Sequence, residues 1–277
     1  MIDQLGRRCA LVMLASMTLA VAMGLIAWGP IELTAHVHRY ADDRAWLGIP
    51  GAANVWVNAA MFAAGAWGWR TTRRSHWPTH LRTPWQLFQL CAMASAAASA
   101  AYHARPDDTL FVLTHVATAS GFVMLTLGHL AERVHSCFGS RSLCGTVLLG
   151  ITLTGASMLF GRALSGALDM RPLLLLEVIP VLVIPAGALS LPGQSTLFFD
   201  WVLVLSLYAL AKLLEAGDAL ILEASGWISG HTLMHLALTA AVGWMAYRAA
   251  LARAAAASVG EESGDTSQRD TSLNTTA

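Results

Sequence analysis

The chain is divided into apolar blocks of about twenty residues, which is the length that an α-helix needs to cross the hydrocarbon core of a bilayer. Only 12% of its 277 residues are charged, against about a quarter in soluble domains. Within lipid, backbone polar groups must pair inside the chain, and a helix achieves this locally. We therefore expect an all-α, polytopic membrane helical bundle. The expected spans lie at residues 9–28, 53–70, 85–104, 109–130, 142–160, 172–190, 197–216 and 228–250.

These blocks divide the chain into four parts. Residues 1–30 are expected to form an N-terminal membrane anchor span, because no small-residue cleavage site follows the first apolar block cleanly. An outer loop at 31–52 leads to a seven-span core at 53–250, which makes eight spans in total. Residues 251–277 are rich in alanine, serine, threonine and charge, and this composition predicts a disordered cytoplasmic tail.

The arginines indicate how the chain is inserted. With eight spans and the N-terminus inside, eleven of the 16 arginines fall in inner segments and five in outer ones. Lysine and arginine are enriched in cytoplasmic loops. We therefore expect both termini to face the cytoplasm.

Three histidines stand at the outer ends of two expected spans. His231 and His235 are four residues apart, so both imidazoles share one helical face, and His103 ends a different span. Three histidine nitrogens with one open position are a common ligand set for catalytic zinc. Ionisable residues inside a membrane are costly and mark functional sites. We predict that these three side chains bind Zn²⁺ near the outer surface.

Other polar residues of the spans are expected at the same outer level, and the inner half is expected to be nearly bare. This set contains His115, Glu177, Lys212 and Glu215, of which the last two are expected to pair with each other. Several tryptophans stand near span ends, where they are expected to act as interfacial anchors. They include Trp28, Trp46, Trp77, Trp85 and Trp227.

Composition excludes several classes of protein. The net charge is zero and no glycine-rich phosphate loop occurs, so no nucleic-acid partner is expected. The four cysteines form no C-x-x-C pair, which argues against a disulfide framework and against a thiolate metal site.

The motifs around the histidines resemble those of a known family. Ser99-x-x-x-His103 and Ser229-Gly-His231-Thr-Leu-Met-His235 are similar to signatures of the alkaline ceramidase-like membrane hydrolases. The stretch from His38 to Asn58 looks like the N-terminal signature of their bacterial branch. This branch lies within a wider seven-span group that includes adiponectin-receptor-type and hemolysin-III-like proteins. The resemblance covers roughly residues 36–248, which leaves the first span as an addition.

The resemblance implies a zinc-dependent amidohydrolase of the bacterial inner membrane, with its site facing the periplasm. Its substrate would be a membrane lipid with a ceramide-like amide, and water would be the nucleophile. Ser99 lies one turn before His103 on the same helical face, so its hydroxyl is placed to donate to the developing oxyanion.

One departure from the family affects the mechanism. Family members carry an aspartate eleven residues after the first motif histidine, and here that position is Thr114. A threonine hydroxyl does not titrate usefully, so another group must act as general base. The substitutes are His115, Asp107, Asp108 and Glu177, and we take His115 as the candidate catalytic residue.

Three other functions stay open. The missing aspartate favours a catalytically impaired, receptor-like or scaffold protein that keeps the zinc. His115 and His129 lie fourteen residues apart and would suit a haem-binding electron carrier, if another helix supplied a matching pair. A proton-coupled transporter would need carboxylates through the full thickness of the membrane. No calcium site is expected, because Gly51 stands where eukaryotic ceramidases carry an acidic ligand.

Overall fold

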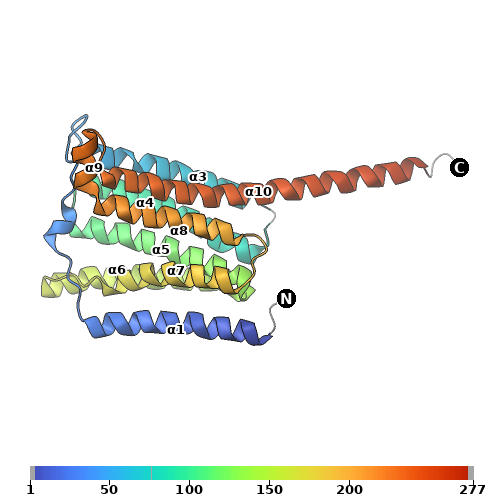
Figure 1. Cartoon of the computed structure of the whole chain (residues 1–277), viewed down its shortest axis with the longest axis horizontal. Coiled ribbons are helices and arrows are strands. Elements are labelled where there is room, and N and C mark those ends of the chain that lie inside the picture. The colour runs from blue at the N-terminus through green and yellow to red at the C-terminus, as the bar shows by residue number, and fades with distance from the viewer. Residues whose placement is uncertain (1–3, 76, 274–277) are drawn as a thin grey trace.

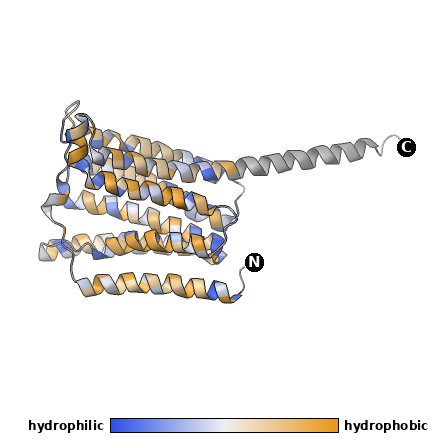
Figure 2. Cartoon of the chain, in the orientation of Figure 1, coloured by the Kyte–Doolittle hydropathy of each residue, from blue (hydrophilic) through white to orange (hydrophobic). Residues whose placement is uncertain are grey.

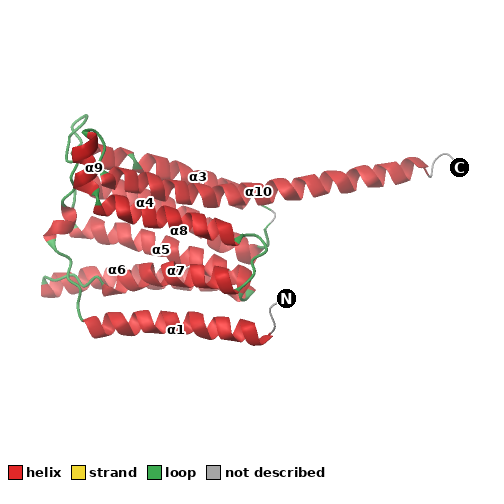
Figure 3. Cartoon of the chain, in the orientation of Figure 1, coloured by secondary structure: helices red, strands yellow, loops and turns green. Residues whose placement is uncertain are grey.

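The computed structural model describes the backbone of residues 4–75 and 77–273, and side chains within these ranges except those of 35–36 and 252–273. The described chain is helical, with loops and two isolated bridges between the helices (Figure 3). Its long helices run alongside one another (Figure 1). They are α1 (Gln4–Trp28), α3 (Asn58–Arg73), α4 (Thr79–Ala104), α5 (Asp108–Arg133), α6 (Arg141–Ser165), α7 (Arg171–Ser190), α8 (Phe198–Ala216) and α10 (Gly230–Leu273). The short ones are η1 (Ala35–His38), α2 (Ala52–Trp56), η2 (Ser136–Gly139) and α9 (Asp218–Ser225).

Four of the described helices, α1, α5, α6 and α7, are long and apolar enough to cross a membrane. Apolar residues fill their middles (Figure 2). By contrast, α3 has only 16 residues, below the length of about 20 that a bilayer requires, and α8 carries Asp200, Lys212 and Glu215. The molecule is therefore a helical protein with several candidate membrane spans, and the count of eight stays a prediction.

Each expected span coincides with a long helix, but some boundaries differ. α4 begins at Thr79 rather than at 85, and it contains Pro84. Residues 79–84 are mostly polar, so the apolar block from which the span was predicted begins after the helix does. The short α9 lies between two expected spans. The predicted tail at 251–277 has a helical backbone as far as Leu273, its side chains from 252 on lie outside the described residues, and its disorder stays a prediction.

Helix packing places α4 in the middle of the bundle, against α3 and α5, while α10 packs against α3 and α8. The largest apolar core lies between α4, α5 and α10, and it includes Trp77 and Trp85, whose rings meet edge to face at 4.8 Å. The expectation that these two tryptophans act as interfacial anchors is therefore wrong. Trp28, Trp46 and Trp227 are exposed.

The segment after α1 is joined to the loop between α6 and α7. Leu33 donates its backbone N–H to the Leu168 carbonyl at 2.9 Å, and Met170 donates to the Ile31 carbonyl at 2.8 Å. This short antiparallel contact fixes where the chain leaves the first helix, which itself packs mainly on α7.

Charged side chains are buried at the end of the bundle opposite to the start of α10. Glu132 accepts hydrogen bonds from the backbone N–H groups of Ser195 and Thr196, and it pairs with Arg133. Asp200 of α8 pairs with Arg248 of α10 at 2.9 Å. We call Glu132, Arg133, Asp200 and Arg248 the distal cluster. The end of the bundle that was expected to be the inner one therefore buries an ion pair between two helices, Asp200 of α8 with Arg248 of α10.

Candidate metal centre

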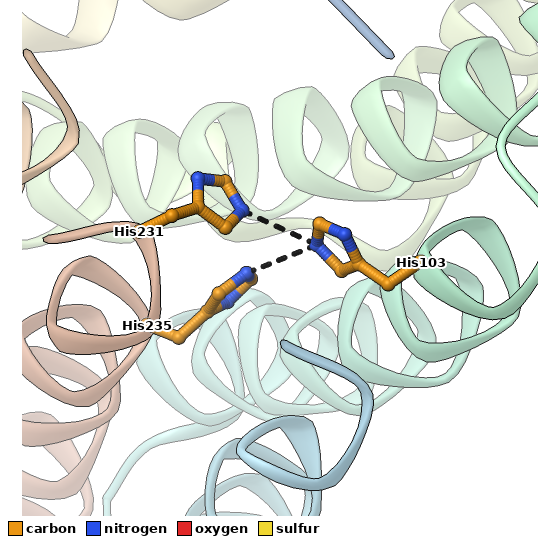
Figure 4. Close-up of side chains that lie close together, drawn as sticks. All are labelled: His103, His231 and His235. Atoms are coloured by element: carbon orange, nitrogen blue, oxygen red, sulfur yellow. Dashed lines mark hydrogen bonds between the residues drawn. The ribbon is translucent and has the colours of Figure 1, made fainter. Parts of the chain in front are cut away.

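The three predicted histidines meet at one point. His103 at the end of α4 places its Nε2 atom 3.3 Å from Nε2 of His231 and 3.3 Å from Nε2 of His235. All three side chains are buried, and they turn toward one another from two helices (Figure 4). One ligand atom from each residue lies within 4.8 Å of the others, which makes the group able to hold a metal ion.

The start of α10 is held against the corner between α8 and α9. Gly230 has no side chain, and a Cβ atom there would lie 2.1 Å from the Leu214 carbonyl oxygen. The Asp218 carboxylate accepts the His231 backbone N–H at 2.7 Å, which satisfies one of the free donors at the helix N-terminus. These contacts fix the height at which His231 and His235 face α4.

A loop segment crosses the outward side of the centre. We call residues 38–44 the strap. The ring of Tyr40 lies over two of the imidazoles, with centroids 4.7 Å from His103 and 4.4 Å from His231. Burial raises the pKa of Tyr40 above its usual value near 10, so the phenol stays protonated at neutral pH.

Polar contacts hold the first half of the strap. His38 bonds through Nδ1 to the Tyr102 hydroxyl at 2.9 Å and through Nε2 to Asp108 at 2.7 Å. Asp108 also pairs with Arg162 of α6. In the middle of the strap, the Ala41 backbone N–H donates to Asp218 at 2.9 Å.

The far end of the strap is held by an ion pair. Arg44 bonds to both oxygens of Asp42 and donates to the Trp227 carbonyl at 2.7 Å, which ties the strap to the turn before α10. The Arg44 guanidinium holds the pKa of Asp42 below its usual range. In this pair the Asp42 carboxylate is buried, and the Arg44 side chain is half exposed.

The donor set fits a divalent transition metal. Nitrogen atoms bound to tetrahedral zinc at 2.0–2.1 Å are about 3.3–3.4 Å apart, and the two measured Nε2 separations agree with this. Three imidazoles also suit copper, iron or nickel. The Nδ1 atoms of His103 and His235 are buried without a hydrogen-bond partner. The outer acceptors that usually orient metal-binding histidines are thus absent around these two rings among the described residues.

The other predicted site residues lie on α4 and α5, and the hydrogen bonds of His115 and Thr114 are with groups other than the three histidines. Ser99 is buried one turn before His103 on α4, as expected from their spacing. His115 bonds through Nδ1 to Glu177 of α7 at 2.8 Å and stacks on Phe111. Thr114 donates its hydroxyl to the Leu110 carbonyl at 2.9 Å, so this group is engaged with the backbone.

Two further expectations concern ion pairs. Glu177, which was expected at the outer level, pairs with His115 at 2.8 Å. Lys212 and Glu215 pair at 2.7 Å, as predicted from their spacing.

Sequence reasoning missed Tyr40 and Asp218. Neither residue belongs to a periodic pattern, because Tyr40 lies in a loop and Asp218 begins a short helix that was not expected. The one available signal was an aspartate immediately after Gly217, which is typical of a helix start.

Comparison with known proteins gives no match. No family model matches the chain, and neither the curated proteins nor the solved structures contain a match to it. The resemblance to ceramidase-like hydrolases therefore rests on the motifs alone.

Proposed function

We propose that the protein is a zinc-dependent membrane hydrolase that cleaves a lipid amide of the ceramide type. The observation that carries this proposal is the convergence of three buried Nε2 atoms from α4 and α10. Neutral imidazoles in this number are the ligands of many catalytic zinc sites. Zinc held there would polarise the amide carbonyl and lower the pKa of water at the site.

Side chains of the chain itself supply the remaining roles. Ser99 would donate its hydroxyl to the oxygen of the amide carbonyl as negative charge develops on it. His115 would move the proton. Its Nδ1 is held by the Glu177 carboxylate, which leaves Nε2 as the atom that accepts a proton from water and returns it to the leaving amine. A carboxylate behind a histidine performs the same orienting task in hydrolytic triads.

The bilayer supplies the substrate in this proposal. The strap covers the side of the centre that faces the end of the bundle, with Tyr40 in contact with two ligand rings. A membrane lipid would enter between helices instead. The excess of arginines in one set of loops supports an orientation with both termini in the cytoplasm. The resemblance to the bacterial branch supports a bacterial inner membrane, in which the centre would then face the periplasm.

Metal content and amide hydrolysis together test the proposal. The purified wild type should carry close to one zinc per chain and release fatty acid from a panel of ceramides. His231→Ala should lose both properties. His115→Asn is the matched variant, because it should keep the metal and lose hydrolysis. A wild type that binds no metal would refute the proposal.

The second candidate is a receptor-like or scaffold protein that keeps the metal without hydrolysis. The observation in its favour is the Thr114 hydroxyl, which is bonded to the helix backbone at the position of the family aspartate. Retained zinc together with no hydrolysis of any ceramide by the wild type would select this candidate.

The packing of His129 argues against a haem carrier. Its ring is buried against Trp201, and it lies so close to α7 that a Cβ atom on Gly187 would be 2.5 Å from Nε2. A porphyrin could not reach this ring without separating α5 from α7.

A further inference from the structure

The chain between the strap and α2 forms a tight hairpin. Trp46 and Ile49 exchange two backbone hydrogen bonds, of 3.1 and 3.0 Å, around the central residues Leu47 and Gly48. Both central residues have positive φ, of 53° and 77°, which defines a turn of type I′. We call residues 46–49 the tip hairpin.

Leu47 is an unusual residue for its position. The first central residue of such a turn is normally asparagine, aspartate or glycine, because a side chain at positive φ crowds the backbone. Leu47 is the one non-glycine residue with positive φ in the described chain. Its side chain is 75% exposed, so no protein contact explains why an apolar residue occupies the strained position.

The neighbours of Leu47 are also apolar and exposed. Trp46 is 62% exposed and meets the ring of Trp56 at 6.4 Å, while Trp227 lies on the adjacent turn and is 71% exposed. Arg44 connects the two parts by donating to the Trp227 carbonyl. The tip hairpin therefore projects from a firmly held base and carries large apolar side chains at its end.

The location of the hairpin indicates what it contacts. The loop leading to α2 extends past the edge of the bundle near α9 (Figure 1). For helices that cross a bilayer, this end of the bundle lies at one membrane surface, and a part that extends sideways there lies over lipid. Tryptophan prefers this interfacial depth.

From these observations we infer that the tip hairpin inserts into the interface of the bilayer, with Trp46 and Leu47 among the lipid headgroups and upper acyl chains. The tip hairpin follows directly after the ion pair of Asp42 and Arg44. It therefore connects the strap over the histidines to the membrane surface. The occupant of this apolar surface is lipid, and the inference does not depend on hydrolase activity.

Depth-dependent fluorescence quenching tests the inference. An environment-sensitive fluorophore is attached to Leu47→Cys in a background that lacks the exposed Cys9 and Cys137. The protein is reconstituted into vesicles of phosphatidylcholine and phosphatidylglycerol, with or without a lipid carrying a nitroxide high on its acyl chain. Arg105→Cys is the matched control in water, because its side chain is 85% exposed at the same end. Leu19→Cys on α1 is the control in lipid.

The nitroxide lipid should quench the label at 47 strongly, and aqueous iodide should quench it severalfold less than the label at 105. A second variant keeps the fold intact, since asparagine suits positive φ. Leu47→Asn should reduce nitroxide quenching of a label at Trp46→Cys. A label at 47 that is as open to iodide as the label at 105 would overturn the inference. Protection from both quenchers would overturn it as well, because protein would then cover the tip.

Discussion

The two ends of the bundle bury polar side chains in opposite ways. In the distal cluster each charge faces an opposite charge, and Glu132 and Asp200 also accept backbone N–H groups. At the other end three rings turn Nε2 atoms toward one another, and the Nδ1 atoms of two rings have no partner. In the first arrangement opposite charges compensate each other, although Nε of Arg133 and Nε of Arg248 are buried without a hydrogen-bond partner. In the second, three ring nitrogens face one another and no charged group of the described residues pairs with them. Three converging imidazole nitrogens are a ligand set that could hold a metal ion, whereas compensated ion pairs are not.

Loss of one ring should have the largest effect on binding. His235→Ala should abolish stoichiometric metal binding, because two imidazoles and water hold zinc far less firmly than three. In chelator it should lower the unfolding temperature only by the cost of the cavity that the buried ring leaves, so most of the stabilisation by metal should be lost in this variant. Elemental analysis and thermal unfolding with and without chelator would check this. A variant that kept its metal would refute the centre.

A substitution in the distal cluster should lower the stability of the fold and leave metal binding intact. Asp200→Ala leaves Arg248 buried without its counter-charge and leaves Trp244 Nε1 without an acceptor. Breaking one side of a buried pair costs about 3–5 kcal/mol of unfolding free energy. Denaturant unfolding should show this loss, and the folded fraction should keep its metal. Unchanged stability would show that the two ends do not differ as described.

The fit between α10 and its neighbours can be tested with two glycines. In Gly230→Ala a Cβ atom would meet the Leu214 carbonyl oxygen, which should cost roughly 1–3 kcal/mol and weaken metal binding by displacing His231. Gly243→Ala on the same helix is the control, because nothing lies within 4 Å of its Cβ position. It should gain up to about 1 kcal/mol. Metal affinity from titration and the free energy of unfolding, measured for both variants, would distinguish Gly230→Ala from Gly243→Ala.

The strap should slow exchange of the metal. Removing the ring in Tyr40→Ala gives up aromatic contacts worth about 0.5–1.5 kcal/mol and opens one side of the centre. A chelator should then extract the metal several times faster than from the wild type. Tyr40→Phe keeps the ring and should release metal at nearly the original rate. Equal extraction rates for the two variants would refute shielding by the strap.

The smallest expected effect is the pH dependence of stability that comes from the ion pair of Asp42 and Arg44. Because Arg44 lowers the pKa of Asp42 in the folded chain, this pair stabilises the fold above the usual carboxyl pKa of 3.8. The stabilisation is lost as the pH falls through the lowered folded value. Thermal unfolding of wild type and Asp42→Asn should differ by at most about 1 kcal/mol at neutral pH and converge in strong acid. A difference that grew with acidification would contradict this assignment.

Much of the histidine end could be predicted from the sequence, and the distal cluster could not. Apolar block length located the long helices, and the spacing of His231 and His235 gave their common face. The distal cluster joins residues that are distant in the chain, such as Glu132 with Thr196, and no local pattern records such a pairing. For the same reason the burial of Trp77 and Trp85 was missed. Position near a span end indicates the depth of a side chain but not the direction in which it faces.

The join between 31–33 and the loop before α7 has a consequence for the first helix. The backbone hydrogen bonds of Leu33 and Met170 hold the chain before the strap against the loop between α6 and α7. The position at which the strap begins therefore depends on this loop rather than on α1. A truncated protein that starts at residue 30 should therefore seat Tyr40 on the same two imidazoles. In that case α1 would cover one side of α7 and would not be needed to position the strap over the histidines.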